Sequence, residues 1–272
     1  MAVSDNLNRL LIGIATQRVI EELTVASLSV WLQQRFRELL FGVRDFVFPP
    51  ICWLCGQVME TERDFCRSCQ ERFRESYRRA CWRCGRSVGP FADTSGGCDR
   101  CAGEHYPFRS VRRLGRYEGV LREAILKVKH LNGEGLAVAL GRLLGQMLAQ
   151  TDCPCDAVVP VPLHWLRYWQ RGYNQAQAIA EGIAQVLGKP VLPRLLRRQR
   201  YTPSQPNQPV TRREENLRGA FALGRGASHL PSAILLVDDV MTTGSTLREA
   251  ARVLRSAGVR QIHVAVLARA EH

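Results

Sequence analysis

The chain has 272 residues, 46% of them hydrophobic, which is enough for a substantial core in one large or two unequal domains. Its formal net charge of +13 at pH 7 favours anionic partners such as phosphorylated metabolites, nucleic acid or a membrane surface. No apolar run is long enough to span a bilayer, and the N-terminus does not resemble a signal peptide. We therefore expect a cytoplasmic protein whose ten cysteines are reduced or metal-bound rather than paired as disulfides.

Residues 1–47 are predicted to form a helical extension that ends at Phe48-Pro49-Pro50, because proline cannot continue a helix. Its apolar side chains fall on one face: Leu32, Phe36, Leu39, Leu40, Val43 and Val47. Packing of this face on the body of the protein is the favoured interpretation, with a membrane-surface or partner-binding helix as the alternative. Residues before about Ser29 have weaker periodicity and are expected to be a poorly ordered extension.

Residues 48–108 contain four C-x-x-C pairs. The cysteines are Cys52, Cys55, Cys66, Cys69, Cys81, Cys84, Cys98 and Cys101. Each pair can present two thiolates, so two pairs complete a tetrahedral shell and the block can hold up to two structural zinc ions. Tandem pairing is preferred, although interleaved pairing fits the same spacings, and an iron–sulfur cluster is a minor alternative. Few large apolar residues separate the cysteines, so this cysteine-rich block is expected to need metal to fold.

Residues 109–272 alternate strand-like and helix-like segments, which predicts an α/β fold with a parallel sheet covered by helices on both faces. The first predicted elements are a strand over 111–117, a helix over 120–130 and a helix over 136–148. Cys153 and Cys155 lie in a loop and are interpreted as plain thiols because they lack a matching pair.

A strand over 157–162 is followed by a helix over 175–187, for which Asn174 is the predicted cap. Arg167 and Arg171 lie between these two elements. A helix N-terminus flanked by arginines suits an anion, although exposed arginines are equally common as solubilising residues. Farther along, the arginine-rich, proline-broken segment 194–218 is predicted to be a flexible loop or lid that binds phosphates of a metabolite or of nucleic acid.

The most informative stretch runs from Ile234 to Thr246. A buried strand ends in Asp238 and Asp239, and a loop of small residues then opens a helix that extends to Ser256. The unpaired N–H groups of a helix start, with nearby hydroxyls, form a candidate phosphate cradle. The carboxylates suit sugar hydroxyls or Mg²⁺. The alternative is an ordinary N-capped helix after a core strand. The pattern is neither a P-loop nor a dinucleotide-binding glycine motif.

The stretch Val237-Asp238-Asp239-Val240-Met241-Thr242-Thr243-Gly244-Ser245-Thr246 resembles the phosphoribosyl pyrophosphate (PRPP) motif of type I phosphoribosyltransferases. The order of motifs from about Leu40 to the C-terminus is similar to the ComF family of competence proteins, which joins a double zinc ribbon to such a domain. Further matching segments are Tyr117-Glu118-Gly119, Pro160-Val161-Pro162-Leu163, Arg171-Gly172-Tyr173-Asn174-Gln175, Thr202-Pro203-Ser204-Gln205, Arg213 with Asn216, and Arg218-Gly219-Ala220-Phe221.

This resemblance implies that Asp238 and Asp239 engage the ribose hydroxyls of PRPP and act as the catalytic carboxylates, with Mg²⁺ accompanying the ligand. It implies that the 5′-phosphate binds Thr242, Thr243, Gly244, Ser245 and Thr246. The region from Pro162 to Arg171 takes the place of the pyrophosphate loop, and the nearby aromatics Trp165, Tyr168, Trp169 and Tyr173 either pack near an acceptor or anchor the loop.

The expected activity is transfer of a phosphoribosyl group to an unidentified acceptor with release of pyrophosphate. PRPP binding has more support than turnover, since no residue must be a general base. The alternative is a non-catalytic factor of the DNA uptake machinery that binds single-stranded DNA or partner proteins. The sequence leaves the oligomeric state open.

Overall fold

The computed structural model describes residues 49–61, 63–76, 79–151, 153–200, 216–224 and 230–271. The predicted N-terminal helix and residues 201–215 of the basic segment lie outside the described residues. Contacts along the chain define two units, residues 1–52 with 57–63 and residues 53–56 with 64–272. In the described part of the first unit, an antiparallel bridge joins Ile51 to Val58. The second unit contains all the helices and strands described below.

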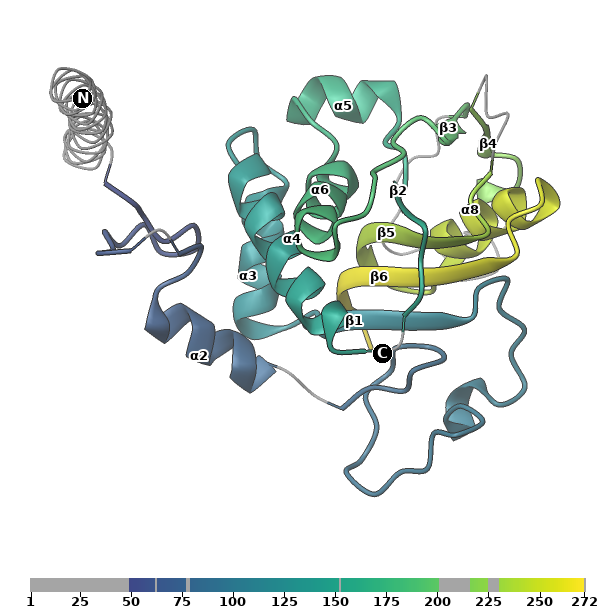
Figure 1. Cartoon of the computed structure of the whole chain (residues 1–272), viewed down its shortest axis with the longest axis horizontal. Helices are drawn as coiled ribbons and strands as arrows, with labels where there is room; N and C mark the ends of the chain where they lie inside the picture. The colour runs from purple at the N-terminus through teal and green to yellow at the C-terminus, as the bar shows by residue number, and fades with distance from the viewer. Residues whose placement is uncertain are drawn as a thin grey trace, which may run out of the picture. The chain divides into compact units, whose positions relative to one another are not determined.

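A four-stranded parallel sheet forms the centre of the second unit, as predicted (Figure 1). Its strands lie in the order β1-β6-β5-β2. Their bounds are Ser110–Arg116 for β1, Ala157–Pro160 for β2, Ala233–Met241 for β5 and Gln261–Arg269 for β6. Residues 234–237 of β5 and 262–269 of β6 are buried without a break, which matches a sheet covered on both faces.

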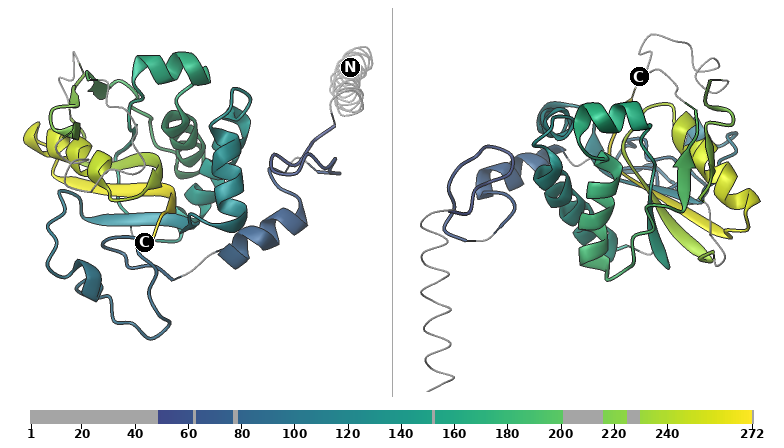
Figure 2. Two further views of the ribbon diagram at one scale, coloured as in Figure 1. Left: turned by 180° about the vertical axis from the view of Figure 1, so that it is seen from behind. Right: turned by 90° about the horizontal axis from the view of Figure 1, so that it is seen from above.

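Helices cover both faces of this sheet (Figures 1 and 2). Three helices pack together on one face: α3 (Gly119–Val128), α4 (Glu134–Ala149) and α6 (Gln175–Leu187). The other face carries α8 (Ser245–Ser256), whose Leu247 and Leu254 pack with Ile234 and Leu236 of β5. Alternate residues of a strand point to opposite faces, so these contacts place α8 across the sheet from α6.

Close packing fixes α6 against α4. A Cβ atom at Gly141 would lie 2.3 Å from the Ile179 carbonyl oxygen, and one at Gly182 would lie 2.1 Å from the Val138 carbonyl oxygen. Only glycine permits the two backbones to approach this closely. The α6 helix therefore has a fixed position, and so does its N-terminus beside the end of β2.

The chain leaves β2 and β5 in opposite directions. After β2 and α6 it forms a parallel bridge between Val191 and Val158, on the edge of β2 away from β5. After β5 and α8 it returns as β6, on the opposite side of β5. Such a reversal is a topological switch point, and α/β proteins bind ligands at the carboxyl ends of the strands beside it.

Two expectations from the sequence need correction. The strand before the small-residue loop continues through both carboxylates to Met241, because Asp238 and Val240 keep their ladder positions opposite Val266 and Ala268. The start of the basic segment is also not a free loop. Its Leu196–Arg198 forms β3, which pairs antiparallel with β4 (Phe221–Leu223), and Leu196 is buried. The adjacent Arg197 and Arg198 concealed this short strand among the charges of the segment.

The described residues also form three short helices, which are α2 (Arg67–Ser76), the 3-10 turn η1 (Asp99–Cys101) and α5 (Trp165–Arg171). Across the residues that the structure describes, no helix has both the length and the apolar character needed to cross a membrane.

Candidate functional site

The carboxylates of Asp238 and Asp239 lie in β5 just beyond the residue that pairs with the last residue of β2. Pro160 pairs with Val237, and the Val161 N–H donates to the Val237 carbonyl at 2.9 Å. Each carboxylate also accepts the next backbone N–H, from Asp239 to Asp238 at 2.9 Å and from Val240 to Asp239 at 2.7 Å. Both side chains are therefore held at the switch point by their own backbone.

Positive charge reaches the two carboxylates from opposite faces of the sheet. The Lys129 ammonium, just after α3, lies 3.5 Å from the second oxygen of Asp239. The Arg198 guanidinium of β3 acts on Asp238, where it favours the ionised form. Burial and the neighbouring charge of Asp239 outweigh it and raise the pKa of Asp238 above its usual range. A cation or a ligand that neutralises Asp239 would thus favour ionisation of Asp238.

The loop between β5 and α8 leaves a helix start open. Gly244 is the N-cap with φ of +82°, and no side-chain hydrogen bond caps the helix. The hydroxyls of Thr243 and Ser245 bond each other at 2.7 Å, and the Ser245 N–H makes only a long contact of 3.4 Å with the Thr243 hydroxyl. The first-turn N–H groups and hydroxyls can therefore receive an anion. The alternative of an ordinary N-capped helix lacks its capping side chain.

Glycine is required at the centre of this loop. A side chain at Gly244 would be strained by the positive φ, and its Cβ would lie 2.6 Å from the Met241 Cε atom. The Met241 side chain, buried at the end of β5, thus packs directly beneath the loop.

The second predicted helix start, at α6, is already capped. The Asn174 side chain accepts the Ala176 N–H at 3.2 Å and donates to the Val161 carbonyl at 3.1 Å. Arg171 donates to the Gln175 side chain at 3.0 Å. Arg167 lies within α5, so Arg167 and Arg171 both belong to the connection between β2 and α6. In the same connection, burial and the charges of Arg198 and Arg167 lower the pKa of His164.

The sequence placed Tyr173 beside the expected pyrophosphate loop, but it did not identify Lys129 or Arg198 as parts of this neighbourhood. Tyr173 is buried, and its hydroxyl donates to the Val128 carbonyl, which fixes the end of α3 that carries Lys129. The sequence places Lys127, Lys129 and His130 before the turn residues Asn132-Gly133, but no local pattern could place Lys129 opposite Asp239. Only the packing of α3 on the sheet does so.

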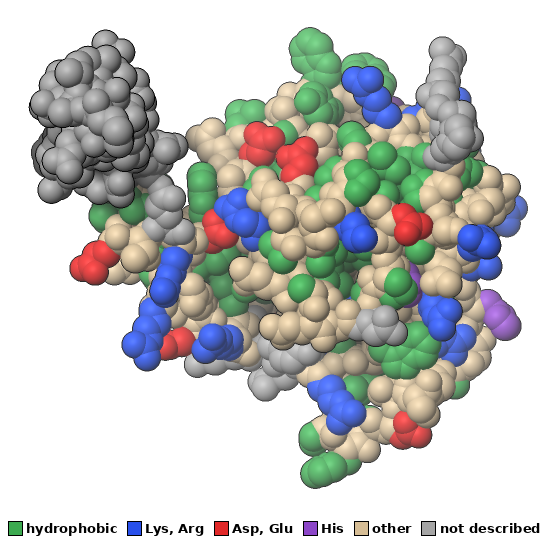
Figure 3. Space-filling model, viewed as in Figure 1, with side chains coloured by type: hydrophobic (Ala, Val, Ile, Leu, Met, Phe, Trp, Pro, Cys, Tyr) green, Lys and Arg blue, Asp and Glu red, His purple; other side chains and the backbone are tan. Residues whose placement is uncertain are grey.

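The aromatic residues near α5 divide into two groups. Tyr173 is 6% exposed and anchors the loop, whereas Trp165, Tyr168 and Trp169 are 62%, 49% and 83% exposed. Hydrophobic side chains stand out from the surface over α5 (Figure 3). The interpretation as core anchors therefore holds for Tyr173 alone.

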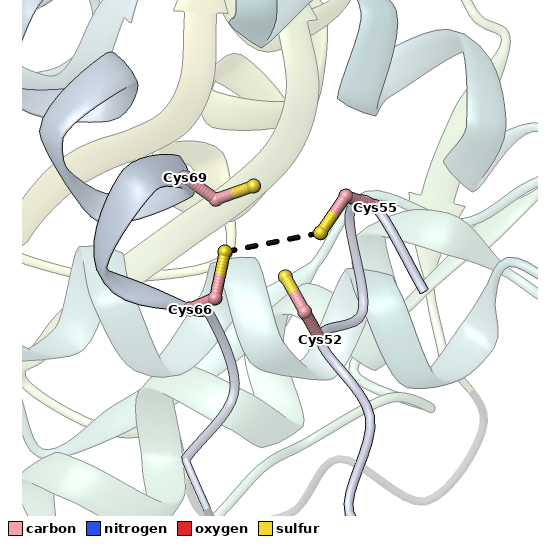
Figure 4. A group of neighbouring side chains, drawn as sticks. All are labelled: Cys52, Cys55, Cys66 and Cys69. Carbon is pink, nitrogen blue, oxygen red and sulfur yellow. Dashed lines mark hydrogen bonds between the residues drawn. The ribbon is translucent and has the colours of Figure 1, made fainter. Parts of the chain in front are cut away.

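The eight paired cysteines form two groups of four in tandem order. One contains Cys52, Cys55, Cys66 and Cys69, whose side chains converge (Figure 4), and the other contains Cys81, Cys84, Cys98 and Cys101. In each group the sulfurs all lie within 4.8 Å of one another. The preferred tandem pairing is confirmed, and the interleaved alternative is excluded.

The geometry of both groups suits zinc. Tetrahedral zinc with bonds of about 2.3 Å separates its sulfurs by about 3.8 Å. The observed separations are 3.8 Å for Cys55–Cys66 and Cys81–Cys101, and 3.7 Å for Cys84–Cys98. Gly56 and Gly85 follow the second cysteine of their pairs with φ of +76° and +73°, as a knuckle turn requires. Cys153 and Cys155 belong to neither group.

Sequence profiles of two families match the chain: "Double zinc ribbon domain" over residues 43–102 and "Phosphoribosyl transferase domain" over residues 174–272. Together with the fold, they define a class of protein that joins a double zinc ribbon to a phosphoribosyltransferase domain.

Curated relatives identify the family more closely. Competence protein F of Haemophilus influenzae is 32% identical over 223 residues, which cover 79% of this chain and 94% of that protein. DNA utilization protein YhgH of Salmonella typhi is 31% identical over 227 residues, covering 81% and 97%. The chain therefore belongs to the family of competence protein F and DNA utilization protein YhgH.

Among solved structures, the glutamine PRPP amidotransferase of B. subtilis has a TM-score of 0.36 and 25% identity. The match covers 52% of this chain and 30% of that one.

Proposed function

We propose that the protein binds PRPP with Mg²⁺ at the carboxyl ends of β2 and β5. The observation that carries the proposal is the uncapped start of α8, which directly follows two carboxylates at a topological switch point. In this proposal Asp238 and Asp239 bind the ribose hydroxyls, and the loop from Thr242 to Thr246 binds the 5′-phosphate.

The pyrophosphate group of the ligand is assigned to the cationic side chains around the β2–α6 connection. Arg167 and Arg171 belong to that connection, and Lys129 contributes an ammonium already attracted to Asp239. Magnesium would supply neutralisation of the pyrophosphate charge. The chain's own residues orient the ribose and hold its two charged ends apart, so positioning is their main contribution to any reaction.

The proposed reaction transfers the phosphoribosyl group from PRPP to an acceptor and releases pyrophosphate. Displacement at the sugar carbon passes through an oxocarbenium-like state, which the ionised carboxylates near the ribose would stabilise. The test is pyrophosphate release from PRPP by the zinc-loaded protein across a panel of bases and nucleotides, in the cytoplasmic range of pH and Mg²⁺. Release with none of them, despite binding, would reduce the proposal to a PRPP-binding protein.

Binding itself is tested by isothermal titration calorimetry. We expect saturable Mg²⁺-dependent binding of PRPP that Asp238→Ala with Asp239→Ala abolishes. Ribose 5-phosphate serves as the matched probe, because it retains the contacts assigned to the carboxylates and the loop but lacks the pyrophosphate. Retained PRPP affinity in the double variant would contradict the assignment of the carboxylates.

A second function, binding of single-stranded nucleic acid, is favoured by the exposed surface of α5. Trp165, Tyr168 and Trp169 are exposed aromatics on a helix that also carries two arginines, and such residues stack on bases of any sequence. The names of the related proteins, which refer to competence and DNA utilization, agree with this proposal.

The measurement for this second function is a fluorescence titration with a labelled oligonucleotide at several salt concentrations. Charge reversal at the exposed Arg197 and Arg200 should weaken binding and lower its salt dependence, and Trp169→Ala should weaken binding with the salt dependence unchanged. Absent or salt-independent binding would remove this function.

A further inference from the structure

The second cysteine group (Cys81, Cys84, Cys98 and Cys101) is connected through Arg269 to the loop from Thr242 to Thr246, which we call the phosphate loop. This residue ends β6, is 2% exposed, and donates from its Nη1 atom to the Cys84 carbonyl. The same Nη1 atom lies 3.1 Å from the Met241 Sδ atom. Met241 pairs with Arg269 across the ladder and packs beneath Gly244. A single buried guanidinium therefore joins the metal knuckle to the residue that supports the loop.

A second connection reaches the loop from its other end. Arg248, in the first turns of α8, pairs with the Glu104 carboxylate, and its guanidinium lies 4.6 Å from the centre of the Tyr106 ring. Glu104 directly follows the second cysteine group, and its N–H donates to the Cys101 carbonyl at 3.1 Å. Arg83, between Cys81 and Cys84, donates to the Glu104 carbonyl at 2.6 Å. The cysteine group is thus connected through Arg269 to Met241, before the loop, and through Glu104 to Arg248, after it.

The segments around the first cysteine group contact other parts of the domain. Lys127 of α3 donates to the Leu54 carbonyl at 2.6 Å, and Arg142 of α4 pairs with Asp64. These contacts fall on the α3–α4 face, away from α8 across the sheet. The two groups have similar knuckles but different neighbours, so they provide an internal comparison.

We infer that zinc in the second cysteine group holds the phosphate loop in the conformation that receives an anion, and that Arg269 is the positioning residue that transmits this effect. Without metal, a four-thiol knuckle with little apolar support loses its fixed backbone. The Cys84 carbonyl would then no longer be held against Arg269. A buried guanidinium that loses its acceptor is costly, so it would move and release Met241 from beneath Gly244. The ligand-binding part of this inference rests on the proposed function, whereas the ordering of the loop does not.

Arg269→Met in the full-length, zinc-loaded protein is the direct test, with Arg269→Lys as a second variant that keeps the charge. The matched control is Arg116→Met, at the end of the neighbouring strand β1, where the arginine pairs with Glu118 and Glu271 instead. Hydrogen exchange of the peptide over residues 242–247 reports the loop without any ligand. We expect at least tenfold faster exchange in both Arg269 variants and unchanged exchange in the control. Zinc content should remain equal in all three.

PRPP affinity gives the second readout. A coupling free energy of ordinary size between two sites corresponds to a loss of affinity of about 5- to 150-fold. We expect a loss within this range in the Arg269 variants and none in Arg116→Met. Loss of zinc from the second group by Cys98→Ser should reproduce both effects, and Cys55→Ser in the first group should reproduce neither.

Unchanged loop exchange in both Arg269 variants would overturn the inference, and so would equal effects from the two cysteine variants. Absence of PRPP binding in the unmodified protein would contradict the proposed function alone, because the exchange measurement still decides whether Arg269 orders the loop. If Arg269→Met fails to fold, the Arg269→Lys and Cys98→Ser proteins still give the comparison.

Discussion

The N-termini of α6 and α8 lie at the carboxyl ends of the neighbouring parallel strands β2 and β5. They differ in whether a side chain caps their unpaired N–H groups. At α6, the Asn174 side chain caps the helix and also binds the Val161 carbonyl. At α8, Gly244 occupies the cap position and no side chain caps the helix. Both starts lie beyond the carboxyl end of a parallel strand, so dipole and position alone cannot distinguish them. The capping side chain does: it indicates a structural role for α6 and supports the proposed anion-binding role of α8.

The largest effect is expected from Gly244→Val, which places a branched side chain at a positive φ and against Met241. Strain of about 1–3 kcal/mol, with steric displacement of the loop in addition, should lower the free energy of unfolding. PRPP affinity should fall more than 100-fold, since the displaced N–H groups no longer converge on the phosphate. Thermal unfolding and calorimetry measure the two effects separately. A variant that keeps its affinity would show that the anion binds elsewhere.

The next largest effect is expected in the pH dependence of stability, because burial and the charge of Asp239 raise the pKa of Asp238 in the folded protein. In the unfolded chain this carboxyl titrates near its ordinary value of 3.8. Between that value and the raised pKa, the folded state holds a proton that the unfolded state has lost. Stability should therefore fall as pH rises through this window, with a limiting slope of about 1.4 kcal/mol per pH unit.

Asp238→Asn is the control for this titration, and its stability should lack this component of the pH dependence. Affinity for Mg²⁺ and PRPP should change in the opposite direction and increase as pH rises, because the ligand requires the ionised carboxylate. Chemical denaturation at a series of pH values measures the first effect. A stability curve identical for the variant and the unmodified protein would show that Asp238 titrates normally.

Asn174→Ala removes the capping side chain of α6 and so tests the comparison at that helix. Loss of a capping side chain costs about 1 kcal/mol of stability, and PRPP affinity should change less than threefold if α6 has only a structural role. Denaturant unfolding measures the first quantity and calorimetry the second. The opposite pattern, with stability kept and affinity lost, would transfer the anion site to α6.

The smallest effect on stability is expected from Trp169→Ala, since this side chain is 83% exposed. The free energy of unfolding should change by less than about 0.5 kcal/mol. A larger loss, measured by the same denaturant unfolding, would mean that the α5 aromatics support the fold, and would weaken their assignment to nucleic-acid binding.

Local patterns predicted much of this structure. The Asn174 cap, the bounds of α6 and the end of α8 at Ser256 were all read from the sequence, because capping residues and glycine stops act within a few positions of the helix they bound. The four C-x-x-C pairs likewise predicted two tetrahedral groups. Their tandem order was a preference only, because sequence spacing does not determine which turns meet in space.

Long-range relations could not be predicted in this way. Arg269 and Cys84 are 185 residues apart, and a lone arginine at the end of an apolar strand has no pattern that indicates its partner. The pairing of Lys129 with Asp239 depends on how α3 packs on the sheet. The strand β3 was missed because its partner β4 lies beyond a long proline-containing segment, so no hairpin signal joined the two.

The central claim is that the start of α8, and not the start of α6, receives the phosphate. Backbone amide NMR of the zinc-loaded protein tests this claim most directly, during titration with ribose 5-phosphate, which carries the 5′-phosphate but lacks the pyrophosphate assigned to the β2–α6 connection. We predict saturable shifts of the amides of Thr243, Ser245, Thr246 and Leu247, with the amides of Gln175 to Gln177 unchanged. Shifts confined to the start of α6, with the α8 amides unmoved at saturation, would contradict the claim.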